Sequence, residues 1–226
     1  MSNCLVSREI ASEHTQSPHV TGTSVIGIKY KEGILIASDM GGRFTFSQLS
    51  PFDILIVKVL DVQLNGCRII WLHLALQECD FQEVCAILMN LVHNDNMCDD
   101  NNSLGPKELL NYLTRVMYDR RNKFDPLWNS LVLGGVKNGQ IYLATVNMIG
   151  VHYEDDHVAI GLGNHLARPI LRAKWHKDLR FEKAVELLEE CMRVLIHRDR
   201  SAINKIQIAQ ITEAGAKIYP PYSLKL

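Results

Sequence analysis

The apolar residues near the start of the chain follow the pattern of a β-hairpin. Residues 21–30 (TGTSVIGIKY) are rich in β-branched side chains, and residues 34–39 (ILIASD) are again apolar. Residues 31–33 (KEG) separate the two runs and supply a glycine for the turn. Two short apolar runs around such a turn predict two antiparallel strands.

A second pair of apolar runs follows at 54–60 and 67–74, and residues 61–66 are interpreted as the connection between them. The pattern then changes period. From 77 to 93 the apolar residues recur at helical spacing, and this predicts a helix. Residues 97–105 (MCDDNNSLG) are polar and are predicted to be a loop.

Proline residues mark both ends of the next predicted helix. Pro106 suits a first helical turn. The helix is expected to end near Phe124, because Pro126 disfavours helical backbone in the residue before it. The rest of the chain is predicted to form strands at 130–136, 141–148 and near 157–161, helices at 163–175 and 181–198, and strands at 205–212 and 217–219.

The order of these elements is strands, two helices, strands, two helices, strands. This order indicates an α+β fold in which two antiparallel sheets pack face to face with helices outside, a four-layer αββα sandwich. We detect no internal repeat of fixed period and no low-complexity tract.

Composition narrows the classes of function. The chain has 226 residues, 47% hydrophobic and 22% charged, with a formal net charge of −1. A near-neutral chain lacks the basic stripe that nucleic acid or a membrane surface would favour, so neither is expected as a partner. No apolar run is long enough for a transmembrane helix, and residues 1–20 lack the apolar segment of a secretory signal.

The six cysteines do not predict a metal site. None forms a CxxC pair, and Cys79, Cys85, His93 and Cys98 do not have the spacing of zinc ligands. Reduced, buried thiols of an intracellular protein are the better interpretation. No metal and no cofactor is expected.

Several segments resemble proteasome beta subunits. The hairpin TSVIGIKY-KEG-ILIASD is similar to the opening hairpin of that family, with Thr23 at the nucleophile position and Asp39 in register. Residues 198–204 (RDRSAIN) stand where the family has an Arg-Asp-x-x-Ser motif, and Asp199 stands at the aspartate of that motif. The resemblance spans about residues 15 to 212 and implies the N-terminal nucleophile hydrolase version of the αββα sandwich.

Two segments resemble one non-catalytic paralogue of the family in particular. They are residues 116–136, which contain the letters PLWN, and residues 15–26, which are similar to a retained leader. The resemblance therefore implies a leader over 1–22, cut near Thr15, and a beta-subunit domain over 23–226.

The family's chemistry requires a free amine on the nucleophilic threonine, because the α-amine of that threonine takes the proton from its side-chain hydroxyl. The leader would have to be cut directly before Thr23, and Gly22 suits such a bond. The chemistry also needs a lysine beside the hydroxyl, and Leu55 stands at that position. Lys58 lies three residues further on in the same predicted strand. Because successive strand residues point to alternate faces, Lys58 could take the place of this lysine only if the whole strand were turned over.

The supporting positions are also apolar. Leu162, between two glycines, stands where the family has a serine, and Ala202 stands where the motif has its serine. Asp39 and Asp199 are retained. The resemblance therefore implies a vestigial site and an inactive subunit, and the alternative is an active threonine endopeptidase with Thr23 as nucleophile.

As implied by the family, the partners are other alpha and beta subunits in a hetero-oligomeric barrel of twenty-eight subunits, in the cytoplasm and nucleus. Such a subunit would support assembly and ATP-dependent protein degradation by active neighbours. Candidate contact positions are Arg120, Arg121, Lys123 and Trp128, because clustered Arg and Trp suit interface anchors. The paralogue's long C-terminal tail has no counterpart after the final residues PYSLKL, so contacts between rings through it are not expected.

Overall fold

The computed structural model describes residues 24–40, 62–64, 67–75, 78–98, 104–200 and 202–225. The predicted leader with Thr15, the nucleophile position Thr23, the strand over 54–60 and Leu55 lie outside the described residues.

One sheet is built around the predicted opening hairpin. Its five antiparallel strands run in the order β10-β9-β2-β1-β8. They are β1 (Val25–Tyr30), β2 (Gly33–Asp39), β8 (His157–Ile160), β9 (Ile206–Thr212) and β10 (Gly215–Ile218). Every residue of β2 is buried, because this strand is central in the sheet and covered on both faces. This explains why β2 is continuously apolar up to Ala37 instead of alternating.

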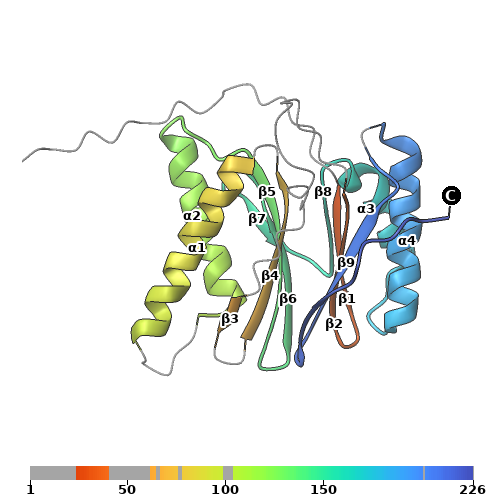
Figure 1. Cartoon of the computed structure of the whole chain (residues 1–226), viewed down its shortest axis with the longest axis horizontal. Helices are drawn as coiled ribbons and strands as arrows, with labels where there is room; N and C mark the ends of the chain where they lie inside the picture. The colour runs from red at the N-terminus through yellow and green to blue at the C-terminus, as the bar shows by residue number, and fades with distance from the viewer. Residues whose placement is uncertain are drawn as a thin grey trace, which may run out of the picture.

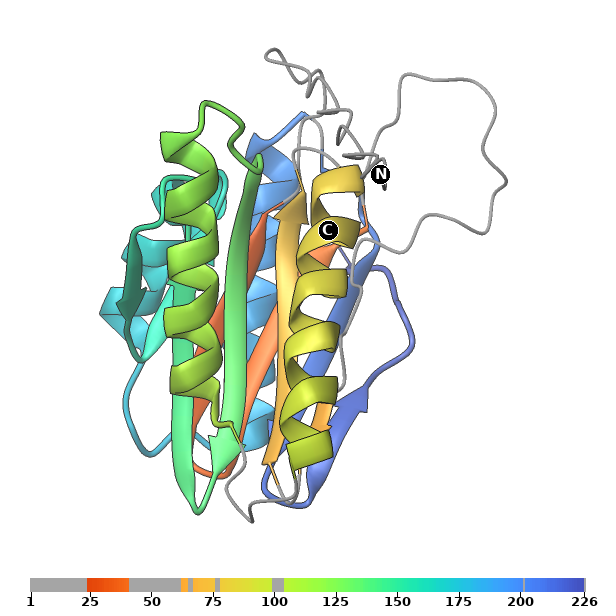
Figure 2. The same cartoon turned by 90° about the vertical axis from the view of Figure 1, so that its left-hand side faces the viewer.

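The second sheet has the order β3-β4-β5-β6-β7, again antiparallel throughout. Its strands are β3 (Val62–Leu64), β4 (Cys67–Ala75), β5 (Asn129–Lys137), β6 (Gln140–Val146) and β7 (His152–Glu154). Figure 1 shows the two sheets stacked side by side with a helix pair outside each. Figure 2 shows the helices α1 (Glu78–Cys98) and α2 (Pro106–Asn122) covering the outer face of the second sheet and running roughly along its strands. The four-layer αββα sandwich predicted from the sequence is confirmed.

Three apolar layers hold the sandwich together. Between the sheets, side chains such as Ile34, Ile36 and Ile211 interlock with Val132 and Leu143. A second layer lies beneath α1 and α2. A third lies beneath α3 (Gly163–Lys174) and α4 (Phe181–Arg198). The buried residues of α4 recur at helical spacing and are Ala184, Leu187, Leu188, Cys191, Met192 and Leu195.

Three details differ from the sequence-based expectations. Residues 62–64, interpreted as part of a connection, form strand β3 and pair with β4. Strand β7 was not predicted, because its three residues are polar or half-exposed and carry no apolar pattern. Helix α1 extends to Cys98, so Met97 and Cys98 are helical rather than part of the loop.

The close approach of β2 and β9 at Gly33 provides a test of the packing. A Cβ atom added at Gly33 would overlap the backbone carbonyl oxygen of Ile211, which cannot move without disturbing the sheet. We expect Gly33→Ala to lower the free energy of unfolding of the full chain by about 1–3 kcal/mol, as overpacking usually does. The control is Gly163→Ala, whose new Cβ would meet only side chains at ordinary distances of 3.4 Å or more. Equal effects of the two substitutions in a urea titration would contradict this packing.

Cys191 provides a second test, of the layer beneath α3 and α4. The residue is fully buried. Burial, aided by the neighbouring Glu190 carboxylate, raises the pKa of the Cys191 thiol to about 12, so almost no thiolate is present near neutral pH. We expect iodoacetamide at pH 8 to alkylate half-buried Cys85 well before Cys191, as measured by peptide-resolved mass spectrometry. Alkylation of Cys191 at the same rate in the folded chain would show that this layer is open.

Candidate functional site

Ser24 is the residue that follows the predicted nucleophile position in the sequence, and it directly precedes β1. It is buried, and its Oγ accepts a hydrogen bond of 3.0 Å from the backbone N–H of Gly163. The pairing of Val25 with Ile160 brings the turn after β8 to the same place. The start of β1 is therefore fixed against the first turn of α3.

Leu162 lies at this junction, at the N-cap of α3. Gly161 before it has a φ of 67°, a left-handed conformation that favours glycine and turns the chain from β8 into the helix. The Leu162 side chain makes no capping hydrogen bond and is 45% exposed. A serine at an N-cap can accept from the free backbone N–H groups of the first turn, and a leucine cannot.

Asp39 ends β2 on the other side of the site. It is almost completely buried, and its Oδ2 accepts a hydrogen bond of 3.4 Å from the backbone N–H of Ile203. The next residue, Met40, donates its N–H to the carbonyl oxygen of Lys205 at 2.9 Å. The segment that follows α4 is therefore held against the end of β2.

Asp199 and Ala202 lie in that same segment. The N–H of Asp199 donates to the Leu195 carbonyl at 2.7 Å and ends the helix, and the N–H of Ala202 donates to the Asp199 carbonyl at 3.2 Å. Asp199 is buried, and Ala202 is half-buried.

The two sides of the site are joined by the sheet itself. Val25 of β1 pairs with Ser38 of β2, so the Leu162 junction and the Asp39 segment flank adjacent strand ends. The structure thus places Asp39, Asp199, Leu162 and Ala202 at one end of the sandwich. The roles of these residues, and of Thr23 and Leu55 outside the described part, stay predictions.

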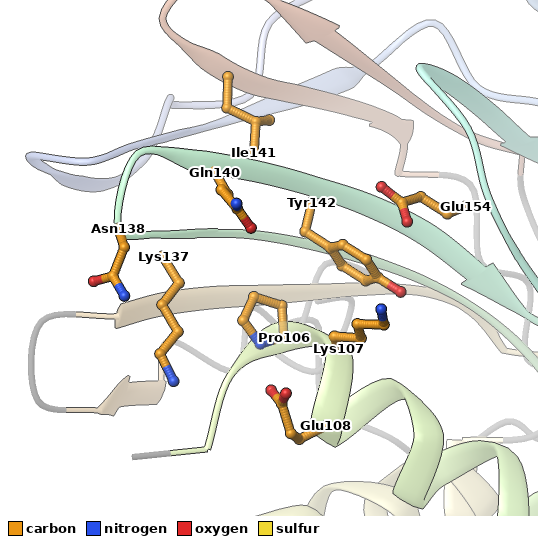
Figure 3. A pocket seen from close by; sticks show the side chains of 9 residues that line it. All are labelled: Pro106, Lys107, Glu108, Lys137, Asn138, Gln140, Ile141, Tyr142 and Glu154. Atoms are coloured by element: carbon orange, nitrogen blue, oxygen red, sulfur yellow. The ribbon is translucent and has the colours of Figure 1, made fainter. Parts of the chain in front are cut away.

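A separate hollow of about 640 Å³ lies between the first turn of α2 and the β5–β6 hairpin. Figure 3 shows Lys107, Glu108, Lys137, Tyr142 and Glu154 around it, so charges of both signs line it. Glu108 already accepts the N–H of Gly105 at 2.9 Å and thereby caps α2. Burial, together with the two carboxylates, raises the pKa of Tyr142, which keeps the phenol neutral. This hollow lies beside the turn after Lys137, and neither Ser24 nor Leu162 lines it.

A group of charges near β7 was missed by sequence reasoning, because β7 itself was not predicted. Asp155 accepts a bond of 3.2 Å from Arg168 of α3, and the Arg168 guanidinium also lies over the Tyr153 ring. Lys29 of β1 lies 3.4 Å from Glu154 and 3.3 Å from Asp156. These contacts tie the β7–β8 connection to the first sheet and to α3, which indicates a structural role.

The candidate contact residues divide into two kinds. Arg120 forms ion pairs with Glu83 of α1 and with Asp125, so its guanidinium is engaged within the chain. Trp128 is half-buried, and its backbone N–H donates to Asp80 at 2.9 Å. Arg121 and Lys123 are exposed, as a contact position requires.

Two further kinds of feature are absent from the described residues. No group of three or more His, Cys, Asp or Glu side chains is arranged to hold a metal ion among them. Among the helices in the described ranges, none combines the length and apolarity needed to cross a membrane.

Comparison with known proteins identifies the family. The family model described as "Proteasome subunit" matches residues 19–211. The chain is 61% identical over 218 residues to proteasome subunit beta type-4 of Arabidopsis thaliana, covering 96% of this chain and 85% of the relative. It is 37% identical to beta type-4 of Xenopus laevis, covering 93% and 85%, and 34% identical to beta type-7 of Saccharomyces cerevisiae, covering 88% and 76%.

These relatives also confirm the paralogue. The leader and the PLWN segment predict the seventh beta subunit, which is called beta type-4 in vertebrates, and the similar proteins carry the names type-4 and type-7. The family match covers most of the described fold, including the junction at Leu162 and the segment after α4. The chain therefore belongs to the proteasome subunit family, in its beta type-4 branch.

Proposed function

We propose that this chain is a non-catalytic structural subunit of the beta ring of the 20S proteasome core. It occupies one position in the ring, packs against alpha and beta neighbours, and supports protein degradation that those neighbours catalyse. The proposal also includes its residence in the cytoplasm and the nucleus, where the particle would act.

The observation that carries the proposal is the apolar character of the junction beside Ser24. Leu162 presents an aliphatic side chain, 45% exposed, at the point where β1 begins. A site for acyl transfer needs donors and acceptors aimed at the reacting atoms. Leu162 offers neither, and Ala202 offers only a methyl group near the end of β2.

Chemistry at the predicted nucleophile supports the same proposal. An uncut peptide nitrogen at Thr23 has no basic lone pair, and loss of a positioned base typically costs a factor of about 10²–10⁴ in rate. Leu55 removes the cation that would favour the alkoxide and lower the pKa of the amine. Each loss acts on the same proton transfer, so the residues that remain, Asp39 and Asp199, have no activated hydroxyl to assist.

Replacement of the nucleophile position tests catalytic inactivity. We expect particles that contain Thr23→Ala in this chain to keep every peptidase activity of the wild-type particle, because the hydroxyl has no base. The measurement is hydrolysis of a panel of fluorogenic peptides by purified particles. A threonine-directed covalent inhibitor should label the active neighbours, which serve as the internal control, and leave this chain unmodified. Loss of one activity in the variant, or an adduct on Thr23, would establish the active endopeptidase instead.

The mature N-terminus tests the predicted processing. We expect the intact mass of this chain from assembled particles to begin near Thr15, cut by an active neighbour, because self-cleavage before Thr23 lacks its lysine. Blocking the neighbours with an inhibitor during assembly should leave a longer leader on this chain. A mass that begins at Thr23 would refute this processing and would supply the free amine that catalysis needs.

A further inference from the structure

Helix α2 ends in a tight turn with an unusual residue at its key position. The N–H of Asp125 donates to the Arg120 carbonyl and the N–H of Phe124 donates to the Arg121 carbonyl, both at 3.1 Å. This pair of bonds defines a Schellman motif, whose C′ residue adopts the left-handed conformation and is usually glycine. Here the C′ residue is Phe124, with a φ of 60°.

A bulky side chain at positive φ is strained, since its Cβ crowds the following carbonyl. The surroundings enforce this conformation. Arg120 binds Asp125 at 2.8 Å on one side and Glu83 of α1 on the other, which ties the turn to the neighbouring helix. Pro126 then prevents the helix from continuing. The turn is therefore rigid, and the strain at Phe124 is retained by its neighbours.

The Phe124 side chain is 92% exposed, more than any other large apolar side chain in the described residues. Burial within the described part of the chain therefore does not offset the strain of its backbone. Arg121 and Lys123, which precede Phe124 in the same turn, are also exposed. In Figure 1 the turn lies between the end of α2 and the start of β5, on the outer helix layer. Strain that persists at an exposed position points to a function outside the chain.

We propose that Phe124 is an anchor that inserts into an apolar hollow, rimmed by carboxylates, on an adjacent subunit of the particle. The ring supplies a large area to bury, and the rigid turn presents it without loss of conformational freedom on binding. Arg121 and Lys123 are the cations that an acidic rim would attract, and they set the charge of the partner surface. This inference rests on the proposed function, because it names a contact through which the chain joins the ring.

Substitutions at Phe124 separate the contact from the fold. Phe124→Gly removes the ring and relieves the left-handed strain, so the isolated full chain should unfold about 2–4 °C higher than wild type. In competition with wild-type chain in cells, its incorporation into particles should nevertheless fall about ten-fold. Phe124→Leu keeps an apolar anchor and should assemble nearly as well as wild type. Met97→Ala, at a site that is 73% exposed on α1, is the control and should leave incorporation unchanged.

The outcomes distinguish this contact from the proposed function. Wild-type chain that fails to enter particles would overturn the proposed function itself. Wild-type chain that enters, together with Phe124→Gly that enters equally well, would overturn only the anchor. A Phe124→Gly chain that is both less stable and poorly incorporated would assign Phe124 a structural role and also overturn it.

The partner's chemistry is tested by photo-crosslinking. A benzoylphenylalanine introduced at position 124 in the full chain should crosslink, within assembled particles, to a different subunit, at a peptide with apolar residues flanked by Asp or Glu. In the same competition in cells, Arg121→Glu should lower incorporation relative to wild-type chain, because it places a carboxylate against the carboxylate rim. A crosslink to a second copy of this chain, to a basic peptide, or to no subunit at all would contradict the proposal.

Discussion

The two sheets meet through branched aliphatic side chains with a glycine among them, and this contact determines where everything else lies. Gly134 of β5 faces Ile34, Ile36 and Ile211 of the other sheet, and a Cβ there would come within 2.7 Å of the Ile211 side chain. The absence of a Cβ at Gly134 lets the sheets approach to full contact, which buries the face of β2 that carries Ile34 and Ile36. The layer beneath α3 and α4 buries the other face of β2, at Leu35 and Ala37. The helices then cover the remaining apolar faces, so the strand ends are left to carry chemistry and the outer surfaces of the helix layers to carry contacts.

The candidate site depends directly on this arrangement. Because β1 and β2 are central strands, their ends are held by partners on both sides, through Gly163 at Ser24 and through Ile203 at Asp39. Such a scaffold could position a catalytic group accurately. Leu162 and Ala202 place apolar side chains at that end of the scaffold, and under the proposed function the same backbone architecture serves as a structural subunit.

The opening hairpin, both helix pairs and the four layers could be predicted because burial imposes a period on the residues. Strands β3 and β7 could not, because three residues are too few for a period, and pairing with a neighbour decides them. At the site, Asp39, Asp199, Leu162 and Ala202 were singled out by a family resemblance, and only the structure shows that they lie at one end of the sandwich, since no local pattern links residues so far apart. The strained turn at Phe124 was also missed. Pro126 predicted where the helix ends, but the left-handed position in the turn is occupied by phenylalanine instead of the usual glycine, so the sequence carries no signal for it.

In the proposed function, this chain acts through its contacts with other subunits in a mixed beta ring. Native mass spectrometry of core particles purified through a different subunit measures this directly, because it reports the copies of each chain. We expect one copy of this chain in every beta ring, retained in intact particles together with the active neighbours. A chain found only as a free monomer, or as a ring made of itself alone, would contradict it.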